Sequence, residues 1–166
     1  SHTVLELCEN GHDVTDFDNL SSGNLLNIDS QAEFIQGDIL KNDDLKNVFN
    51  GKFEAVFHFA ALKAVGESML EPGKYATSNI TGTINILNKM LENNMKYFIF
   101  SSTAAVYGMP EYLPVDEKHP INPINFYGYT KLAIENLLHW YSNLKGIRFG
   151  ALRYFNAAGY DMQGRI

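Results

Sequence analysis

The sequence contains a single cysteine, Cys8, so no disulfide can form within the chain. One thiol in 166 residues is typical of a protein from a reducing compartment, and we expect a cytoplasmic location. Apolar runs are all interrupted within about ten residues, which is too short to span a bilayer. The chain also opens without a basic segment followed by an apolar one, so the sequence predicts neither an export signal nor a membrane anchor.

Basic residues are scarce as well. Lys and Arg number 13 against 19 Asp and Glu, which gives a formal net charge of −6 at pH 7. A surface of this sign repels the phosphates of nucleic acids and anionic lipids, so we expect neither as a partner. Five histidines are scattered without metal-ligand spacing, and we predict no metal site. Hydrophobic residues make up 45% of the chain, an ordinary globular composition that excludes a disordered chain.

Short apolar runs alternate with longer helical patterns, which is typical of an α/β fold with a parallel sheet covered by helices. The predicted strands are residues 13–18, 33–36, 55–59, 97–101 and 149–153. The predicted helices are residues 4–9, 43–50, 73–94 and 126–143, and residues 108–123 form an irregular loop. The length suits one domain, so we predict a doubly wound parallel sheet over residues 1–166 with helices on both faces.

A glycine-rich phosphate-binding turn is missing from the sequence. A doubly wound nucleotide-binding fold normally begins with a strand and such a turn, which lead into the first helix. This chain lacks an initiating Met and enters a helical pattern directly at residues 1–3. We therefore expect a partial domain, whose central first strand and turn lie outside this sequence. Made alone, such a segment is expected to be inactive and poorly folded.

Tyr127 and Lys131 carry the strongest chemical signal. They are four residues apart at the start of a predicted helix, so their side chains share one face. A free tyrosine has a pKa of about 10, too high for a base at neutral pH. A neighbouring ammonium group favours the phenolate and lowers this pKa, and a cofactor cation would add to the effect. On its own the Tyr-x-x-x-Lys pattern is weak and more often marks two ordinary surface residues than a catalytic pair.

Two further polar features lie upstream. Ser101-Ser102-Thr103 follows a predicted buried strand, at the edge where open α/β sheets bind ligands. A hydroxyl there can bind the substrate oxygen whose proton Tyr127 removes, or it can simply cap local backbone. Asn79 lies inside a predicted helix, where asparagine is unfavourable. Considered alone, it is best interpreted as a tolerated polar residue on an exposed face.

Acidic residues follow the first two predicted strands. A carboxylate at Asp18 can accept hydrogen bonds from a ribose 2′-hydroxyl and repels a 2′-phosphate, which favours NAD over NADP. The pair Asp18-Asn19 is equally consistent with a simple turn. Asp38, which follows Gly37, is placed to meet an adenine edge in the same way.

Together these residues resemble the extended short-chain dehydrogenase/reductase family, and most closely its UDP-glucose 4-epimerase branch. The resemblance runs through essentially the whole chain. Its most specific part is residues 62–68, the run Leu-Lys-Ala-Val-Gly-Glu-Ser, which is characteristic of the epimerases. Residues 1–3 resemble the segment that follows the family's glycine-rich turn. The implied fold is Rossmann-like, without the first strand and that turn and without the C-terminal portion that grips the uridine diphosphate.

The resemblance implies roles for individual residues. The catalytic positions that it implies are Tyr127, Lys131, Thr103 and Asn79. The cofactor-binding positions are Asp18, Asn19, Ser22, Gly23, Asp38, Ile39, Phe59, Ala60, Ala61, Lys63, Asn79, Ser101, Tyr127, Lys131, Tyr154 and Phe155. The substrate-binding positions are Lys63, Thr103, Tyr127 and Asn156.

The implied activity is the NAD-dependent interconversion of UDP-glucose and UDP-galactose, by transient oxidation and re-reduction at C4. The nicotinamide carries this chemistry, and the protein supplies position and electrostatics. The implied assembly is a homodimer in which the two long predicted helices of each subunit form a four-helix bundle.

Three other functions are weighed against this one. In the 4,6-dehydratases of the family, an Asp-Glu pair comes directly after the catalytic Thr. Here Ala104 and Ala105 follow Thr103, and because methyl groups cannot transfer protons, dehydration is not favoured. A UDP-glucuronate epimerase or decarboxylase stays open, although we locate no basic partner for the sugar carboxylate. A non-catalytic NAD-binding sensor is expected to lose Tyr127 or Lys131, and both are present.

Overall fold

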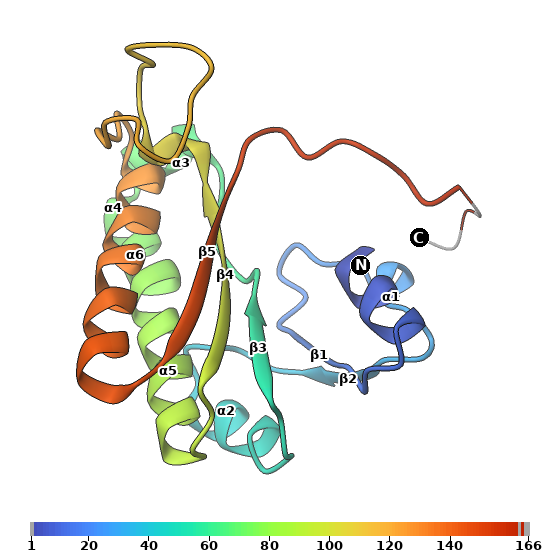
Figure 1. Cartoon of the computed structure of the whole chain (residues 1–166). Helices are drawn as coiled ribbons and strands as arrows, with labels where there is room; N and C mark the ends of the chain where they lie inside the picture. The colour runs from blue at the N-terminus through green and yellow to red at the C-terminus, as the bar shows by residue number, and fades with distance from the viewer. Residues whose placement is uncertain (1, 163, 165–166) are drawn as a thin grey trace.

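The computed structural model describes residues 2–162 and 164 (Figure 1), so Ser1 of the predicted segment 1–3 lies outside the described residues. The strands are β1 (Thr15–Asp18), β2 (Glu33–Gln36), β3 (Ala55–His58), β4 (Tyr97–Thr103) and β5 (Arg148–Tyr154). The helices are α1 (His2–Glu9), α2 (Asn42–Val48), α3 (Val65–Leu70), α4 (Pro72–Tyr75), α5 (Gly82–Glu92) and α6 (Phe126–Lys145). Three shorter elements are the 3-10 turns η1 (Leu25–Asn27) and η3 (Ala104–Val106) and the π-helical segment η2 (Ala76–Thr81).

The paired strands are all parallel, as predicted, but they form two sheets instead of one. β1 pairs with β2, and β4 lies between β3 and β5. Within the described residues no ladder joins these two sheets. The register of β4 with β5 sets Thr103 opposite Tyr154, so two predicted site residues meet at one sheet edge.

Apolar side chains join the three-stranded sheet to its helices. α5 and α6 lie beside each other along one face of β3–β5 (Figure 1), and Tyr141 of α6 donates a hydrogen bond to Asn88 of α5. Phe98 and Phe100 of β4 are fully buried under them. Burial of such a side chain stabilises the fold by about 1.5–3 kcal/mol. The buried core comprises Leu45, Val48, Phe49, Ile86, Leu87, Met90, Met95, Phe98, Phe100, Ile134, Leu138 and Ile147.

Two predicted helices have different outcomes. The helix predicted at residues 126–143 is confirmed as α6, where Asn125 accepts a hydrogen bond from the Gly128 amide and Gly146 ends the helix at φ 72°. The helix predicted at residues 73–94 is helical, but it is divided into α4, η2 and α5. Helical periodicity was present in both, and only the tertiary contacts described below explain the π-helical segment. α3 was not predicted at all.

No helix among the described residues has the length and apolar character needed to cross a membrane.

Gly108 fixes the turn that leads from η3 into the loop before α6. Its φ of +70° is unfavourable for other residues, and an added Cβ would overlap the carbonyl oxygen of Asn122. We expect Gly108→Ala to lower the free energy of unfolding by about 2 kcal/mol or more, measured by urea denaturation. Gly73→Ala is the matched control, because nothing lies within 4 Å of its added Cβ. Equal effects of the two changes would contradict this account of the turn.

Candidate active site

Lys131 is buried at the junction of α6 and β4. Its Nζ donates a hydrogen bond to the Ser101 carbonyl at 2.9 Å and lies 4.8 Å from the centroid of the Phe100 ring. The residue is only 2% exposed. Burial disfavours the ammonium form and lowers the pKa of Lys131 to about 8. The structure therefore holds a cation, or a readily deprotonated amine, at the carboxyl end of β4.

Tyr127 lies one turn before Lys131 on the same helix face, as predicted. Burial raises the pKa of Tyr127 above its ordinary value, and the hydrogen-bonding hydroxyl of Thr103 opposes this by favouring the phenolate. In the chain alone the pKa of Tyr127 is therefore raised, and its lowering by Lys131 together with a cofactor cation stays a prediction. The Lys131 ammonium group donates to the Ser101 carbonyl and lies 5.9 Å from the centroid of the Tyr127 ring.

Thr103 caps local backbone, which was one of the two interpretations of the sequence, and its role toward a substrate oxygen stays a prediction. Its Oγ1 accepts a hydrogen bond from the Ala105 amide at 3.2 Å and so caps η3. The same hydroxyl interacts with the side chain of Tyr127. The end of β4 and the start of α6 thus bring together two of the four predicted catalytic side chains.

Residues that the sequence analysis missed hold the first turn of α6 in place. The Ser68 hydroxyl donates to the Val65 carbonyl and accepts a hydrogen bond from the Tyr127 amide at 3.0 Å. At Gly128 an added Cβ would lie 2.7 Å from the Ala105 carbonyl oxygen, so only glycine allows helix and η3 to approach this closely. A glycine inside a predicted helix is a usable signal for such an approach. Ser68 ends the run of residues 62–68 that carries the family resemblance, but no role was predicted for it, because that role depends on the unpredicted α3.

Asn79 is buried within η2, in contrast to the exposed position inferred from it alone. Its Oδ1 accepts a hydrogen bond from the Leu62 amide at 2.8 Å, and its Nδ2 donates to the Leu62 carbonyl at 3.0 Å. The same Nδ2 donates to Thr130 Oγ1 at 3.2 Å, and this hydroxyl donates to the Tyr127 carbonyl. π-Helical segments occur frequently at functional sites. Here the segment turns one side chain toward both the loop after β3 and the first turn of α6.

The ends of β1 and β2 form a separate polar region. Asn19 Nδ2 donates to Asp38 Oδ2 at 3.3 Å, and Asp18 Oδ1 accepts from the Leu20 amide at 2.6 Å. An open pocket of about 310 Å³ lies here, lined by Asn19, Gln36, Gly37, Asp38, Lys41 and Asp44. An added Cβ at Gly23 would lie 3.0 Å from Asp18 Oδ1, so the glycine keeps the chain close to this carboxylate.

This donor set fits the adenosine end of a dinucleotide. Carboxylates accept hydrogen bonds from ribose hydroxyls, and the pocket beside Asp38 offers both donors and acceptors to a purine edge. Tyr127 and Lys131 lie on another element, α6, so a single ligand that contacts both regions must be extended.

The remaining predicted site positions lie in or just after the five strands. The Ile39 side chain packs toward Gly82 of α5, and its carbonyl accepts a hydrogen bond from Asn85 Nδ2. The exposed members are Ser22, Gly23, Phe59, Ala60, Lys63, Tyr154, Phe155 and Asn156, whereas Ser101 and Ala61 are half-buried. The roles of these residues in binding cofactor or substrate stay predictions.

The buried ammonium group of Lys131 makes stability depend on pH. Its pKa of about 8 in the folded chain lies below the unfolded value of about 10.4, so the unfolded chain binds more protons between these values. We therefore expect the free energy of unfolding to rise from pH 8 to pH 10 relative to Lys131→Met, which lacks this group. Urea denaturation at each pH measures the difference between the two proteins. A difference that stays constant across this interval would contradict the lowered pKa.

The chain is similar in sequence to curated proteins of known activity. The chain is 44% identical over 167 residues to the UDP-glucose 4-epimerase of Lactobacillus helveticus, an alignment that covers 100% of this chain and 51% of that protein. It is 46% identical to the UDP-glucose 4-epimerase of Halalkalibacterium halodurans, over 100% of this chain and 50% of that protein. The chain spans about half the length of the curated relatives it matches.

Solved structures give the same result. One crystal structure of a UDP-glucose 4-epimerase has a TM-score of 0.96 and 43% identity, over 99% of this chain and 50% of that chain. The UDP-glucose 4-epimerase of Brucella ovis, solved in complex with NAD, has a TM-score of 0.93 and 41% identity, over 98% and 50%. These likenesses confirm the predicted Rossmann-like fold. Because residues 1–165 match the NAD dependent epimerase/dehydratase family, this chain belongs to that family.

Proposed function

We propose that the full-length protein that carries this chain interconverts UDP-glucose and UDP-galactose with NAD as its cofactor. The observation that carries the proposal is the arrangement of Tyr127, Thr103 and Lys131 at the junction of α6 and β4. It is supported by relatives named UDP-glucose 4-epimerase, one of them solved with NAD.

In this proposal Tyr127 moves the proton of the sugar 4-hydroxyl. As phenolate it accepts that proton during oxidation, and as phenol it returns the proton during reduction. A group that acts both ways needs a pKa near the working pH, so the raised pKa of Tyr127 must come down when the site is filled. Positive charge beside the phenolate does this, and the Lys131 ammonium group lies 5.9 Å from the centroid of the Tyr127 ring. The Thr103 hydroxyl orients the 4-oxygen.

NAD, when bound, supplies the acceptor and donor of hydride at C4. Asp18 and the Asp38 pocket would hold its adenosine end, and Lys131 would bind the nicotinamide ribose. Asn79 holds the backbone of Leu62 and, through Thr130, the first turn of α6, so it keeps the walls of the site in register. These residues bind and orient the reacting groups.

Dehydration remains the less favoured chemistry. Ala104 and Ala105 begin η3 directly after Thr103, where a dehydratase needs an acid and a base. The methyl groups of these two residues cannot carry protons. Action on a UDP-glucuronate substrate is kept as an alternative that the assay below separates.

Tyr127→Phe tests the proposed proton transfer. We expect it to lower the conversion of UDP-galactose to UDP-glucose by about 100-fold or more, because phenylalanine cannot exchange a proton. The measurement is a coupled assay of UDP-glucose on the full-length protein, without added NAD. Tyr129→Phe is the matched control, since this neighbouring tyrosine is 51% exposed and lies outside the proposed machinery.

The outcomes separate the candidate functions. Loss of conversion in Tyr127→Phe alone would support the epimerase. Consumption of UDP-glucuronate or a dTDP-sugar by the unaltered protein, without conversion of UDP-galactose, would keep the family and overturn the substrate. Full activity in Tyr127→Phe would overturn the assigned base.

We also propose that this protein is a cytoplasmic homodimer that pairs through α6. Trp140 and Leu144 are one turn apart on this helix, and they are 64% and 69% exposed. Apolar side chains this large and adjacent are favourable at a subunit interface. The single thiol at Cys8 supports the location in a reducing compartment.

Charge at the proposed interface tests the dimer. We expect Trp140→Glu to raise the dimer dissociation constant by about tenfold or more, measured by sedimentation equilibrium, because it buries an unpaired charge. Leu26→Glu is the control, since Leu26 is 84% exposed on η1, outside this face. A monomeric unaltered protein at micromolar concentration would contradict the homodimer.

A further inference from the structure

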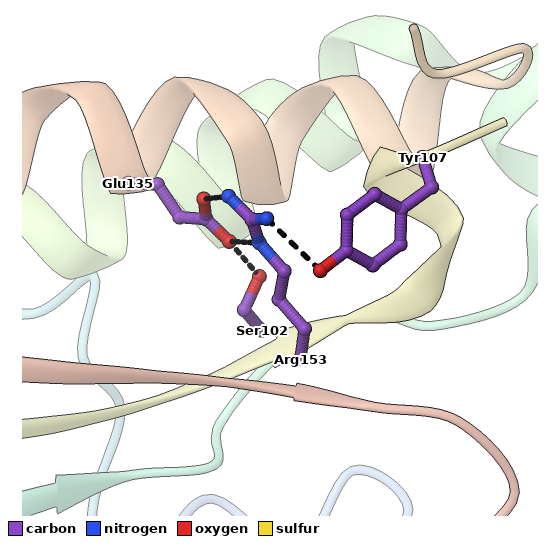
Figure 2. A network of polar contacts seen from close by, with 4 residues as sticks. All are labelled: Ser102, Tyr107, Glu135 and Arg153. Carbon is purple, nitrogen blue, oxygen red and sulfur yellow. Dashed lines mark hydrogen bonds and ion pairs between the residues drawn. The ribbon is translucent and has the colours of Figure 1, made fainter. Parts of the chain in front are cut away.

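Four side chains outside the predicted site form a continuous polar network (Figure 2). Glu135 of α6 accepts hydrogen bonds from Arg153 Nε at 3.0 Å and Arg153 Nη2 at 2.6 Å. The Ser102 hydroxyl donates to Glu135 Oε1 at 2.5 Å. Arg153 Nη1 donates to the Tyr107 hydroxyl at 3.1 Å, and the guanidinium carbon lies 4.9 Å from the centroid of the Tyr107 ring. The network thus joins α6, β4, β5 and the residue that ends η3.

The ion pair at its centre is shielded from water. The Glu135 side chain is 6% exposed and that of Arg153 is 20% exposed. The hydrogen bonds to Glu135 and Tyr107 raise the pKa of Arg153, so the guanidinium stays charged. A buried pair of this kind adds little net stability compared with apolar residues of the same size, because both charges lose their hydration. Its presence therefore calls for an explanation other than stability.

Three of the four members of the network stand beside a residue of the proposed site. Ser102 precedes Thr103 on β4, and Glu135 follows Lys131 by one turn of α6. Arg153 precedes Tyr154, which pairs with Thr103 in the sheet. The two N–H groups on one carboxylate fix both distance and angle, so they hold β5 to α6 with little freedom.

We propose that Glu135 is a positioning residue that holds the ends of β4 and β5 against α6, and so sets Thr103 relative to Tyr127 and Lys131. This inference rests on the proposed epimerase function. Glu135 does not touch the reacting atoms, and its effect is transmitted through Ser102 and Arg153. A displacement of about 1 Å at reacting groups can cost about 100-fold in rate.

The test compares variants that change charge and geometry separately in the full-length protein. Glu135→Gln keeps the size of the side chain but leaves Arg153 without its anion. The double variant Glu135→Leu with Arg153→Met removes both charges and restores an apolar interior, so we expect its melting temperature to recover. Glu92→Gln is the control, because it removes the carboxylate of the exposed Glu92, which pairs with Lys89 at the end of α5.

A positioning role and a structural role predict different results for the double variant. We expect kcat for UDP-galactose to fall by about 100-fold in Glu135→Gln and in the double variant, with KM changing little. In the double variant we expect kcat to stay low although the melting temperature recovers. Recovery of kcat together with the melting temperature would overturn the proposal. Wild-type kcat in Glu135→Gln would overturn it as well.

A second readout does not depend on turnover. Because the Thr103 hydroxyl favours the Tyr127 phenolate, we expect its displacement to raise the pKa of Tyr127, and we expect the same of Thr103→Val. Difference absorbance of phenolate, with Tyr127→Phe as the blank, measures this pKa. We expect the double variant to shift it upward, and an unchanged pKa would overturn the positioning role. If the unaltered protein fails to convert UDP-galactose, the proposed function fails, and this titration still decides the role of Glu135.

Discussion

The close contact between the first turn of α6 and η3 sets the geometry of the candidate site. Gly128 lets the helix approach the Ala105 carbonyl, and Asn125 caps the helix at its start. Once the helix begins there, Tyr127 and Lys131 necessarily project toward the end of β4. Thr103 is then within reach of Tyr127, because it ends β4 directly before η3. A larger side chain at position 128 would separate these elements and the side chains they carry.

Buried polar groups are concentrated around this contact. Lys131 is buried, which disfavours its ammonium form and lowers its pKa, and its Nζ is held by the Ser101 carbonyl. One turn after Lys131 on α6, the negative charge of Glu135 is neutralised by the positive charge of Arg153. Asn79 and Ser68 satisfy backbone groups of the neighbouring loop and of α6. The region combines ordinary core packing with polar groups whose positions are fixed by their hydrogen bonds.

Much of the fold and several site residues could be predicted from local pattern. Each predicted strand and the helix at residues 126–143 is confirmed, because periodicity of apolar residues follows directly from which face is buried. The environment of Asn79 could not be predicted, since its burial comes from Leu62 and Thr130, which are distant in sequence. The raised pKa of Tyr127 in the chain alone could not be predicted either, because it comes from burial in the folded structure. Sequence spacing places a lysine beside a tyrosine, but it does not say which carbonyl takes its hydrogen bond.

The sequence by itself determined the order of strands and helices, the family, and the residue types available for proton transfer at Tyr127, Lys131 and Thr103. All of these depend on residue types and on their spacing along the chain, which can be counted in the sequence. Tertiary structure alone decided the burial of Lys131, the π-helical segment around Asn79, and the pairing of Glu135 with Arg153. Each depends on contacts between segments far apart in sequence, and the free energy of a charge or hydrogen bond is set by what surrounds it in the folded chain.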